Sequence, residues 1–583
     1  MATSTNMAQQ IGDPPSVHPL GTRARVLLTS VFGPYARDDE YGSRALNPME
    51  LYQNQVTRAE GPFSLRMFHR SWGIMLIHAN ISAPCTLLDF PTRERFITEL
   101  QTHQYDIVGI TSIMPNIEKV KVMCSLVRKH LPHATIVVGG HIANAPGLSE
   151  LISADHIARG EGVRWFRQFL GESVDTPIRH PQIVSGLKTR TMGMNVMTRY
   201  GEVAAAVIPS VGCPIGCNFC ATSAMFGGKG KFVNLYETGD ELFGIMCELE
   251  KNLGVRAFFV MDENFLLHRK RTLRLLELIE TNGKSWALYV FSSARVLQSY
   301  SMEQLVRLGV SWVWMGLEGK NSQYAKLASV DTLSLVRTLQ SHGIRVLGSS
   351  IIGLEEHTPK NMDEAIEHAV SHATDFHQFM LYTPIPGTPL YAEHLAKGTL
   401  RDPGEYQEAD IHGQLTFRHQ HPHIKDGQES AFILKAFQRD FEVNGPSVLR
   451  IARTVLQGWR RYKHHTDKAV RDRYTWEARE LVSTFPPTLW AARKWFRKSN
   501  PALSTKLTTL LNEIKDEIGL KARLMAPLAG RVVLSTLRRE DRRLKAGRTY
   551  EPPTFYEMNE QMAPLVPPRK PVPALIKWVT PGS

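Results

Sequence analysis

The residues best suited to chemistry in this chain are three closely spaced cysteines, Cys213, Cys217 and Cys220. Their C-x3-C-x2-C spacing places three thiolates on one loop, and thiolates are soft ligands that bind zinc or iron–sulfur clusters. A structural zinc ion takes four ligands, but residues 218–230 contain no histidine and no further cysteine beyond Cys220. Three thiolates on a [4Fe–4S] cluster leave one iron open to an outside molecule. The spacing therefore favours such a cluster.

The same spacing, with the aromatic Phe219 directly before the last cysteine, resembles the signature of the radical S-adenosylmethionine (radical SAM) family. The resemblance implies that the three cysteines bind a [4Fe–4S] cluster and that Phe219 lies at the cofactor site. It also implies that the amino and carboxylate groups of SAM chelate the open iron.

Strands and helices that could position this loop alternate from residue 201 to residue 400. The predicted strands are Val203–Ile208, Ala257–Met261, Ala287–Phe291, Trp312–Met315, Arg345–Ile352 and Phe376–Leu381. The predicted helices are Glu237–Asn252, Lys270–Thr281, Met302–Leu308, Leu333–His342 and Asn361–His372. This alternation predicts a partial (β/α)6 barrel, in which functional side chains gather at the carboxyl ends of the strands.

Polar motifs that resemble radical SAM motifs follow the second and third strands. Asp262 and Asn264 lie in a Met-Asp-Glu-Asn-Phe segment after the second strand, near the expected SAM-binding edge. Arg295 follows the third strand, where its guanidinium would pair with a carboxylate of SAM or of the substrate. The alternative is a solvated acidic turn around Asp262.

The fourth and fifth strands end in two further motifs of this kind. Glu318 lies in a Gly-Leu-Glu-Gly segment and would accept hydrogen bonds from ribose hydroxyls, although Gly319 replaces the family's usual serine. Ile351, Gly353 and Glu356 form an Ile-x-Gly-x-x-Glu motif. The resemblance implies that this motif lies beside the adenine of SAM.

Residues 21–175 show a second pattern of alternating elements. The predicted strands are Val26–Leu28, Trp72–His78, Asp106–Ser112 and Thr135–Val138, and the predicted helices are 92–100 and Ile117–His130. Continuously apolar strands separated by helices predict a parallel sheet covered on both faces, which makes this an α/β, doubly wound domain. Its ligands would bind at the carboxyl ends of the strands.

Ser112, Gly139 and Gly140 stand at those strand ends, and their Gly-Ile-Thr-Ser and Val-Gly-Gly-His contexts resemble the cobalamin-binding domain of many radical SAM enzymes. The resemblance implies that these three residues line the pocket for the nucleotide tail of cobalamin (B12). The segment Tyr382–Tyr391 resembles the end of the barrel in such enzymes. The D-x-H-x-x-G cobalt-ligand motif is absent, which predicts cobalt without a protein histidine ligand. The alternative is a nucleotide-binding or ligand-free doubly wound fold.

The length and composition of the chain agree with several globular domains. At 583 residues it is too long for one ordinary domain, and its 43% hydrophobic and 21% charged residues are typical of globular proteins. Six cysteines, three of them clustered, do not form a disulfide framework, and the polar start contains no apolar signal core. We therefore expect a cytoplasmic protein. We also expect a disordered segment 1–20, a linker 176–200, a helical region 401–546 and a Pro-rich, extended tail 547–583.

Basic charge is concentrated in the last part of the chain. Residues 431–583 carry 29 Lys and Arg against 14 Asp and Glu, although the whole chain has a net charge of only +13. We expect basic helices there to attach the enzyme peripherally to an anionic membrane, through residues such as Arg460, Lys463 and Arg493. The alternative is a solvated helical surface that closes the open side of the barrel.

Taken together, the motifs resemble a cobalamin-dependent radical SAM enzyme, most often a C-methyltransferase. The resemblance implies that a 5′-deoxyadenosyl radical removes hydrogen from an unactivated carbon, which then receives the methyl group of methylcobalamin. A small-molecule or lipid-like substrate and a reductant such as flavodoxin or ferredoxin are implied, and no nucleic acid is expected. The alternatives are an oxidative cyclase with the same cofactors, an RNA-modifying methylthiotransferase, and a cobalamin sensor or carrier.

Overall fold

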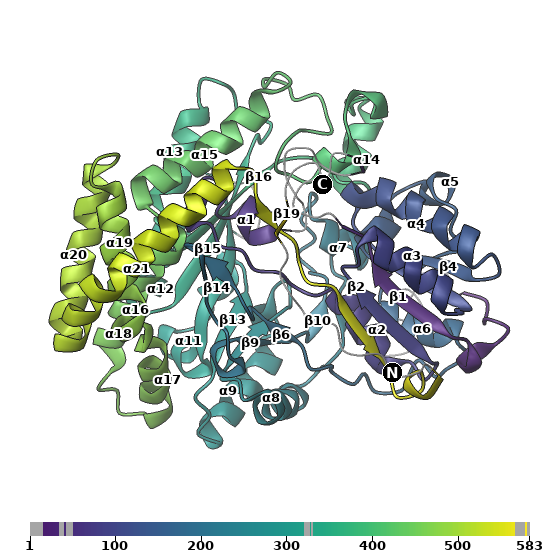
Figure 1. The fold of residues 1–583 in the computed structure, drawn as a ribbon, viewed down its shortest axis with the longest axis horizontal. Coiled ribbons are helices and arrows are strands. Elements are labelled where there is room, and N and C mark those ends of the chain that lie inside the picture. Colours follow the sequence, from purple (N-terminus) through teal and green to yellow (C-terminus); the bar gives the residue numbers. More distant parts are fainter. Residues whose placement is uncertain are drawn as a thin grey trace.

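The computed structural model describes residues 15–33, 40–41, 50–319, 327, 330–565 and 578–579 of the chain. Two sheets lie side by side, and a block of helices flanks the second sheet (Figure 1). The predicted α/β architecture, with a doubly wound sheet, a central parallel sheet and carboxyl-terminal helices, is confirmed. Most of the segment predicted to be disordered, residues 1–14, lies outside the described residues.

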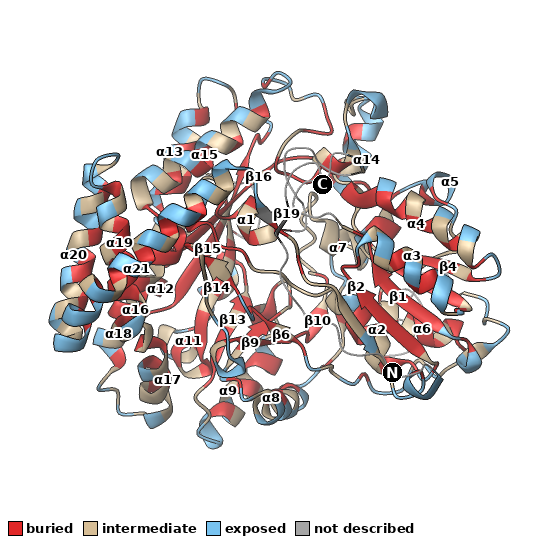
Figure 2. Cartoon of the chain, viewed as in Figure 1, coloured by how far each residue is buried: buried red, intermediate tan, exposed pale blue. Residues whose placement is uncertain are grey.

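The first sheet has the strand order β18-β2-β1-β3-β4-β5, and β1 to β5 pair in parallel. Its strands are β1 (Val26–Ser30), β2 (Cys85–Asp89), β3 (Ile107–Thr111), β4 (Thr135–Gly139), β5 (His156–Ile157) and β18 (Phe555–Met558). Its helices are α2 (Trp72–Asn80), α3 (Arg93–Thr102), α4 (Ile117–His130) and α6 (Gly162–Phe169). Helices α2 and α6 pack together, as do α3 and α4. All five residues of β1 and of β2 are buried, as a sheet covered on both faces requires (Figure 2).

The strand that we predicted at Trp72–His78 is wrong, because this segment forms helix α2. Four consecutive apolar residues, Ile74–Ile77, are buried, since α2 packs on the first sheet, on α6 and on the core of the second domain. A helix that is buried on several sides has no polar face, so its short apolar run cannot be distinguished from a buried strand by periodicity. The strand of this region is β2, which the sequence analysis did not predict.

The second sheet contains the six predicted parallel strands in sequential order, β9-β12-β13-β14-β15-β16, and remains open between β16 and β9. They are β9 (Ala204–Val207), β12 (Ala257–Val260), β13 (Ala287–Phe291), β14 (Val310–Glu318), β15 (Arg345–Ile352) and β16 (Phe376–Leu381). The intervening helices are α8 (Gly239–Leu253), α9 (Arg269–Thr281), α11 (Met302–Leu308), α12 (Thr332–Ser341) and α13 (Met362–Ser371). The partial barrel is therefore confirmed.

The segment predicted as a linker contains short strands. Strand β6 (Val184–Ser185) pairs antiparallel with β9 and extends the barrel sheet. A two-stranded hairpin follows, formed by β7 (Arg190–Thr191) and β8 (Met194–Asn195). Pairings of two residues leave no periodic signal in a sequence, which is why composition alone suggested a linker here.

Helices of the carboxyl-terminal part share a core with the barrel. They are α15 (Gln428–Asn444), α16 (Ser447–Tyr462), α17 (Lys468–Ala478), α18 (Glu480–Ser483), α19 (Phe485–Phe496), α20 (Pro501–Ile518) and α21 (Leu520–Lys545). Most buried apolar residues of α16 and of α18 to α21 form one cluster with Leu347 and Phe376 of the barrel. Tyr52 in α1 (Leu51–Gln55) and Phe63 join the same cluster, so an early segment of the chain is built into this helical block.

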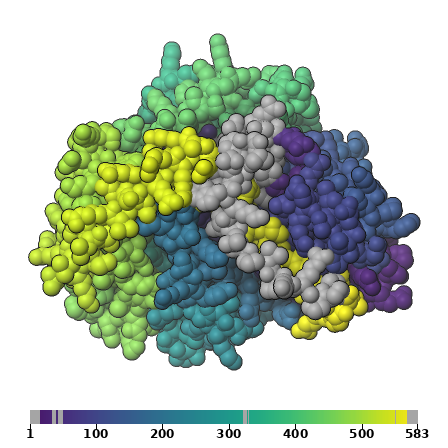
Figure 3. All heavy atoms as spheres, in the orientation of Figure 1, coloured from purple at the N-terminus to yellow at the C-terminus, as the bar shows by residue number. Residues whose placement is uncertain are grey.

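The Pro-rich tail contributes a strand to the first domain. Strand β18 pairs antiparallel with β2, and the Arg70 guanidinium lies 4.5 Å from the centre of the Phe555 ring. The chain thus returns from the helical block to the first sheet, and in Figure 3 the yellow carboxyl-terminal residues lie on both sides of the molecule.

Candidate functional site

The cysteine loop follows the first barrel strand and is held in shape by two glycines. Gly216 has a φ of +68°, and a Cβ there would lie 2.4 Å from Cα of Lys229. Gly212 has a φ of +87°, and a Cβ there would lie 2.7 Å from Cβ of Phe226. Only glycine accepts both the conformation and the close approach. The loop is therefore folded tightly against residues 226–232.

Hydrogen bonds fix the positions of the cysteines within this loop. The Cys220 amide donates to the Cys217 carbonyl at 3.0 Å, and the Ser223 hydroxyl donates to the Cys213 carbonyl at 2.7 Å. Cys220 also precedes helix α7 (Ala221–Met225), and its sulfur accepts a hydrogen bond from the Ser223 amide at 3.4 Å.

The three cysteines fit an iron–sulfur cluster better than a single metal ion. None of the three forms a disulfide bond, and all three are partly exposed. In the described part of the chain, no group of three or more His, Cys, Asp or Glu side chains could hold one metal ion. In a [4Fe–4S] cluster each thiolate binds a different iron, so the sulfurs do not need to converge on one point. Burial raises the pKa of the Cys213 thiol to about 11, so its thiolate requires the positive charge of a metal centre.

The cysteine loop is fastened to the far edge of the barrel by Asn218 and Phe219. The Asn218 carbonyl accepts a hydrogen bond from the Leu390 amide at 3.0 Å, and its side-chain amide donates to the Tyr382 hydroxyl at 3.3 Å. Phe219 packs on a buried apolar cluster that contains Ile351 and Tyr382. The structure thus brings together Phe219 and Ile351, two residues that the sequence analysis assigned to the cofactor site. Sequence reasoning gave no role to Tyr382 beyond its place in a turn motif.

Asp262 is buried and engaged within the protein. Its carboxylate accepts hydrogen bonds from Arg271 at 2.5 Å, from the Ser210 hydroxyl and from the Asn264 amide at 3.0 Å. Arg271 and Asp262 form an ion pair in which both side chains are at most 3% exposed. Asp262 thereby connects β12 to the residues before the cysteine loop. The sequence gave no indication of its partners Ser210 and Arg271.

Asn264 connects the ends of two neighbouring strands. Its side-chain oxygen accepts hydrogen bonds from the Ser292 hydroxyl at 3.2 Å and the Ser293 amide at 3.3 Å, so it ties β12 to β13. Glu318 ends β14, is 5% exposed and has a φ of +51°, next to a break in the register between β14 and β15. A left-handed conformation at a non-glycine residue is typical of functional turns.

The motif after β15 is only partly enclosed. Gly353 has a φ of +78°, and a Cβ there would lie 2.4 Å from the ring of Phe417. Its amide donates to Nδ1 of His357 at 3.1 Å. The predicted contacts Glu356 and Arg295, the latter in α10 (Ala294–Leu297), have exposed side chains. Their roles in cofactor binding stay predictions.

One more acidic group lies beside the cysteine loop. The Glu263 side-chain atom Oε2 is buried and has no hydrogen-bond partner within the described structure. Burial and the charge of Asp262 raise its pKa to about 7, and the Cys213 thiol is within electrostatic range. The sequence analysis included Glu263 in a motif but assigned it no role.

In the first domain, Ser112 and Gly140 pack directly against each other. The Ser112 amide donates to the Gly139 carbonyl at 3.1 Å, and the Ile142 amide donates to the Ser112 carbonyl at 3.2 Å. Gly140 has a φ of +84°, and a Cβ there would lie 2.6 Å from the Ser112 carbonyl oxygen. The three residues predicted to line a cobalamin pocket therefore form one small surface at the carboxyl ends of β3 and β4.

This surface meets the cysteine loop. The 3-10 helix His141–Asn144 directly follows Gly140, and His141 Nε2 lies 3.2 Å from the hydroxyl of Thr222 in α7. The Asn144 side-chain amide donates to the Gly387 carbonyl, beyond β16, at 3.3 Å. A cavity of about 820 Å³ opens beside this junction, lined by residues after β3, β4 and β16. The carboxyl ends of the two sheets therefore face each other, and the cavity opens beside them without being lined by Ser112, Gly139, Gly140 or the cysteines.

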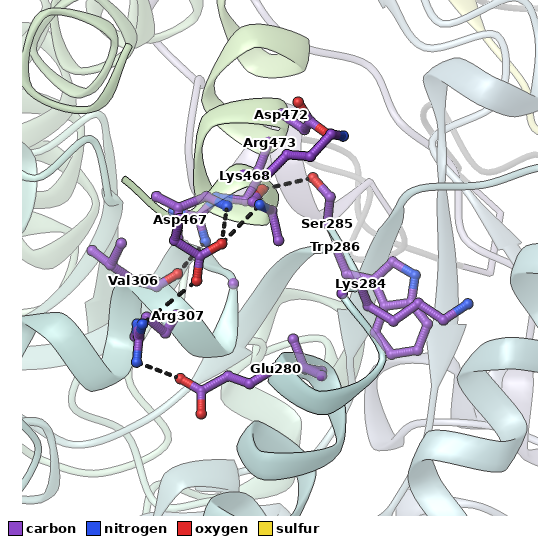
Figure 4. A pocket seen from close by; sticks show the side chains of 15 residues that line it. Glu280, Lys284, Ser285, Trp286, Val306, Arg307, Asp467, Lys468, Asp472 and Arg473 are labelled. Carbon is purple, nitrogen blue, oxygen red and sulfur yellow. Dashed lines mark hydrogen bonds and ion pairs between the residues drawn. The ribbon is translucent and has the colours of Figure 1, made fainter. Parts of the chain in front are cut away.

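A smaller cavity of about 180 Å³ lies elsewhere, where α17 joins the barrel (Figure 4). Several of its polar groups already have partners within the protein: Arg307 pairs with Glu280 at 3.0 Å, and the Ser285 hydroxyl donates to the Ala469 carbonyl at 2.9 Å. It is a seam between packed elements and contains none of the predicted site residues.

Two families of known proteins match the chain. The B12 binding domain matches residues 67–170, and the Radical SAM superfamily matches residues 207–369. An uncharacterized methyltransferase of Pyrococcus horikoshii is 24% identical over 51% of this chain and 70% of its own length. An anaerobic magnesium-protoporphyrin IX monomethyl ester cyclase of Cereibacter sphaeroides is 24% identical over 53% of this chain and 56% of its own length.

Other relatives include further methyltransferases. Among solved structures, the radical SAM methyltransferase TsrM of Kitasatospora setae matches with a TM-score of 0.47 and 15% identity, over 78% of this chain and 99% of its own. The contacts of the individual site residues with cofactors stay predictions.

Proposed function

Because this chain joins a B12-binding domain to a radical SAM domain, it is a cobalamin-dependent radical SAM enzyme, and we propose that it transfers a methyl group to an unactivated carbon of a small-molecule or lipid-like substrate. When bound, the [4Fe–4S] cluster and SAM supply a radical that removes a hydrogen atom from carbon, and cobalamin supplies the methyl group. The residues of the chain bind and orient these groups and keep water away from them.

The observation that carries this proposal is the meeting of the two sheets at their carboxyl ends. His141 and Asn144 contact Thr222 and Gly387, so the turn around Gly140 faces the loop that carries the three cysteines. A methyl donor and a radical source must both reach the same substrate carbon, and this arrangement supports that requirement.

Each part of the site has a proposed task. Cys213, Cys217 and Cys220 would hold the cluster, and Ser112, Gly139 and Gly140 would contact cobalamin. Phe219 and Ile351, which pack in one apolar cluster, would shield SAM from water. The buried carboxylate of Glu318 would accept hydrogen bonds from the ribose of SAM. The cluster also requires a one-electron donor such as flavodoxin or ferredoxin.

Methyl transfer is favoured over cyclisation because more of the matching relatives are named methyltransferases than cyclases. The test uses the full chain, reconstituted anaerobically with iron, sulfide and cobalamin, and SAM labelled with ¹³C in its methyl group. Extracts of cells that lack the enzyme serve as the source of substrate. Mass spectrometry should find a product that gains a labelled methyl group. A product that loses hydrogen without gaining the label would favour a cyclase, and a gain of sulfur together with the methyl group would favour a methylthiotransferase.

We further propose that helix α21 attaches the enzyme to an anionic membrane surface. No helix among the described residues has the length and apolar composition needed to cross a bilayer. Four apolar residues of α21, however, recur every four positions on its exposed side: Leu520, Leu524, Leu528 and Val532, which are between 54% and 71% exposed. This helix carries eight Lys and Arg residues and two acidic residues. An exposed apolar stripe with flanking basic residues is typical of helices that lie in a membrane interface.

The basic residues that the sequence suggested for this contact are less suitable. Arg460 and Lys463 pair with Glu513 and Glu517, at 3.0 Å and 2.5 Å respectively. Their charges are therefore neutralised within the protein. Exposed residues of α21, such as Lys521 and Arg531, would contribute on the order of 1 kcal/mol each at an anionic surface.

Vesicle flotation tests this attachment. The full chain should float with anionic phosphatidylserine vesicles and much less with neutral phosphatidylcholine vesicles, and high salt should weaken the binding. Leu524→Glu and Leu528→Glu should reduce flotation, whereas Leu395→Glu, at an exposed leucine of α14 (Pro389–Ala396), should not. Equal flotation of all three variants would exclude α21 as the attachment site. Truncation is unsuitable because the carboxyl-terminal helices share a core with the barrel.

A further inference from the structure

An apolar cavity lies at the end of the barrel opposite the cysteine loop. It measures about 590 Å³ and is lined by the first residues of the barrel strands, among them Ala257, Ala287 and Trp312. Helices α16 and α19 close it from one side, and residues 185–204 close it from another. Pockets that bind small molecules have volumes of about 300–1,000 Å³ and mostly apolar walls, so this cavity has a suitable size.

An aromatic wall runs from this cavity toward the carboxyl end of the barrel. Tyr289 lies at the cavity and stacks on Trp312, with ring centres 5.7 Å apart. It also stacks on Phe291, which in turn stacks on Trp314 at 4.9 Å. Phe291 and Trp314 are partly exposed. From Ala287 to Phe291 the strand rises about 13 Å, at 3.3 Å per residue. An elongated molecule could therefore contact this wall along the whole strand.

Four of the five charged residues that line the cavity form ion pairs within the protein. Arg345 binds Glu477 at 2.7 Å, and Arg479 binds Glu480 at 3.2 Å. Glu202 accepts a hydrogen bond from the Thr198 amide at 2.9 Å. These five residues are the charged side chains among those that line the cavity. An anionic ligand would find no unpaired cation among the lining residues and would lose its hydration, so the cavity disfavours anionic ligands.

The segment at the mouth of the cavity is rich in methionine and strained. Met192, Met194 and Met197 line the cavity, and Met197 is 41% exposed. Lys188, Met192 and Met197 have φ values between +50° and +58°, and they are three of the six non-glycine residues with positive φ in the described chain. Methionine adapts its shape to different apolar partners, and backbone strain is concentrated at ligand clamps and switch regions.

This mouth lies next to the proposed membrane contact. A Cβ on Gly193, between β7 and β8, would lie 2.8 Å from the Thr536 carbonyl of α21. Arg190 in the same hairpin pairs with Glu540 of α21 at 2.9 Å. A molecule that leaves a bilayer beside α21 would therefore meet this methionine-rich segment.

We propose that this cavity binds the substrate, and that the substrate is an elongated, uncharged, apolar molecule of the isoprenoid or lipid type that enters beneath residues 186–198. The proposal deepens the methyltransferase function proposed above and rests on it for the identity of the ligand as substrate. The apolar body of the molecule would lie along the aromatic wall, and the end that reacts would point toward the carboxyl end of the barrel.

The test measures binding of all-trans-retinol, an uncharged and fluorescent isoprenoid, to the full chain with its cluster reconstituted. Retinol should bind with one site per chain, and retinoic acid, which has the same skeleton with a carboxylate, should bind at least about tenfold more weakly. Ala257→Trp, which fills the cavity, should abolish retinol binding. Ala365→Trp, at a partly buried alanine of α13 outside the cavity, is the matched control.

A second pair of variants guards against misfolding. Met197→Glu introduces a carboxylate at an exposed position of the mouth and should weaken retinol binding about tenfold or more, whereas Met197→Leu should not. Val17→Glu, at an exposed apolar residue far from the cavity, should have no effect. Equal retinol binding by the wild type, Ala257→Trp and Met197→Glu, or no binding by the wild type, would overturn the proposal.

These outcomes are separate from the test of methyl transfer. The retinol measurement needs no turnover of SAM, so its result does not depend on which reaction the enzyme catalyses. Loss of retinol binding in Ala257→Trp and Met197→Glu, with binding retained in Ala365→Trp and Val17→Glu, supports the cavity as the ligand site. A product without a labelled methyl group would disprove methyl transfer and leave the binding result in place.

Discussion

The two ends of the radical SAM barrel are built from different kinds of residue. At the carboxyl end, cysteines, glycines and short polar motifs follow the strands, and several of these residues adopt positive φ or lie in tight turns. At the amino end, apolar side chains from the barrel strands, from residues 52–67, from residues 185–204 and from α16 to α19 enclose an apolar cavity. The first end is predicted to bind groups whose chemistry is fixed, which requires particular residue types. The second end offers shape and apolar surface, which many residue types provide.

The largest effect is expected at the carboxyl end of the barrel, from removal of one ligand of the proposed cluster. Cys217→Ala should abolish formation of 5′-deoxyadenosine and lower the iron content, because two thiolates cannot hold the cluster in place. Cobalamin binding should persist, since its predicted contacts lie in the other domain. Cys247→Ala, in α8, is the matched control and should retain iron. Retention of iron and of SAM cleavage by Cys217→Ala would disprove the site.

A large effect on stability is expected from the ion pair that supports the carboxyl end. Arg271→Met leaves the buried Asp262 carboxylate without its partner, so the free energy of unfolding should fall by about 3–5 kcal/mol. Urea denaturation measures this change. Arg274 lies on the same helix as Arg271 and forms an exposed ion pair with Asp240 of α8. Arg274→Met removes this pair and should change stability little. Equal effects of the two variants would show that Asp262 does not organise this end of the barrel.

A smaller effect is expected at the turn that faces the cysteine loop from the first domain. Gly140→Ala would place a Cβ 2.6 Å from the Ser112 carbonyl oxygen, so the turn must shift and cobalamin should bind about tenfold more weakly. Gly147→Ala has the same disadvantage of a positive φ, but its Cβ would meet no atom closer than 3.9 Å. Equilibrium dialysis with hydroxocobalamin compares the two. If they bind cobalamin equally well, the Gly140 turn is not part of the pocket.

The last effect depends on pH and concerns the segment that closes the barrel near its amino end. Glu60 is buried and accepts hydrogen bonds from the amide and hydroxyl of Ser447 at the start of α16. Burial raises its pKa to about 7 despite the nearby Arg450, and Asp440 adds to this rise. The folded state therefore holds the proton more tightly than the unfolded state does.

The stabilisation that comes from the raised pKa of Glu60 is complete below a pH of about 4.5, the usual pKa of the group. It is lost as the pH rises through about 7. Glu60→Gln should flatten the pH dependence of the free energy of unfolding in this range, by up to about 3 kcal/mol. Glu442→Gln, at an exposed carboxylate in α15, serves as the control. An unchanged pH profile in Glu60→Gln would argue against a protonated Glu60 at this junction.

Much of the fold could be predicted from local patterns. The six barrel strands and the helices between them were found because each strand is a continuous apolar run bounded by helices with one apolar face. Predictions failed where burial removed that contrast: α2 is buried on several sides and was predicted as a strand, while β2, which follows it closely, was missed. The strands β6 and β18 were also missed, because β6 has only two residues and β18 pairs with a strand far away in the sequence.

In the candidate site, the residues that could be identified from the sequence alone are those whose chemistry has no substitute. They are three thiols at a fixed spacing, and glycines where a side chain would collide with the backbone. These constraints are local, so they remain visible without a structure. Which of these residues lie in contact became visible only in the tertiary structure. It placed Phe219 beside Ile351, paired Asp262 with Arg271, left Arg295 and Glu356 exposed, and set Gly140 opposite the cysteine loop. It also assembled the apolar cavity from segments between residues 52 and 488. Apolar surface is additive and depends little on residue type, so such a cavity becomes visible only when distant parts of the chain are packed together.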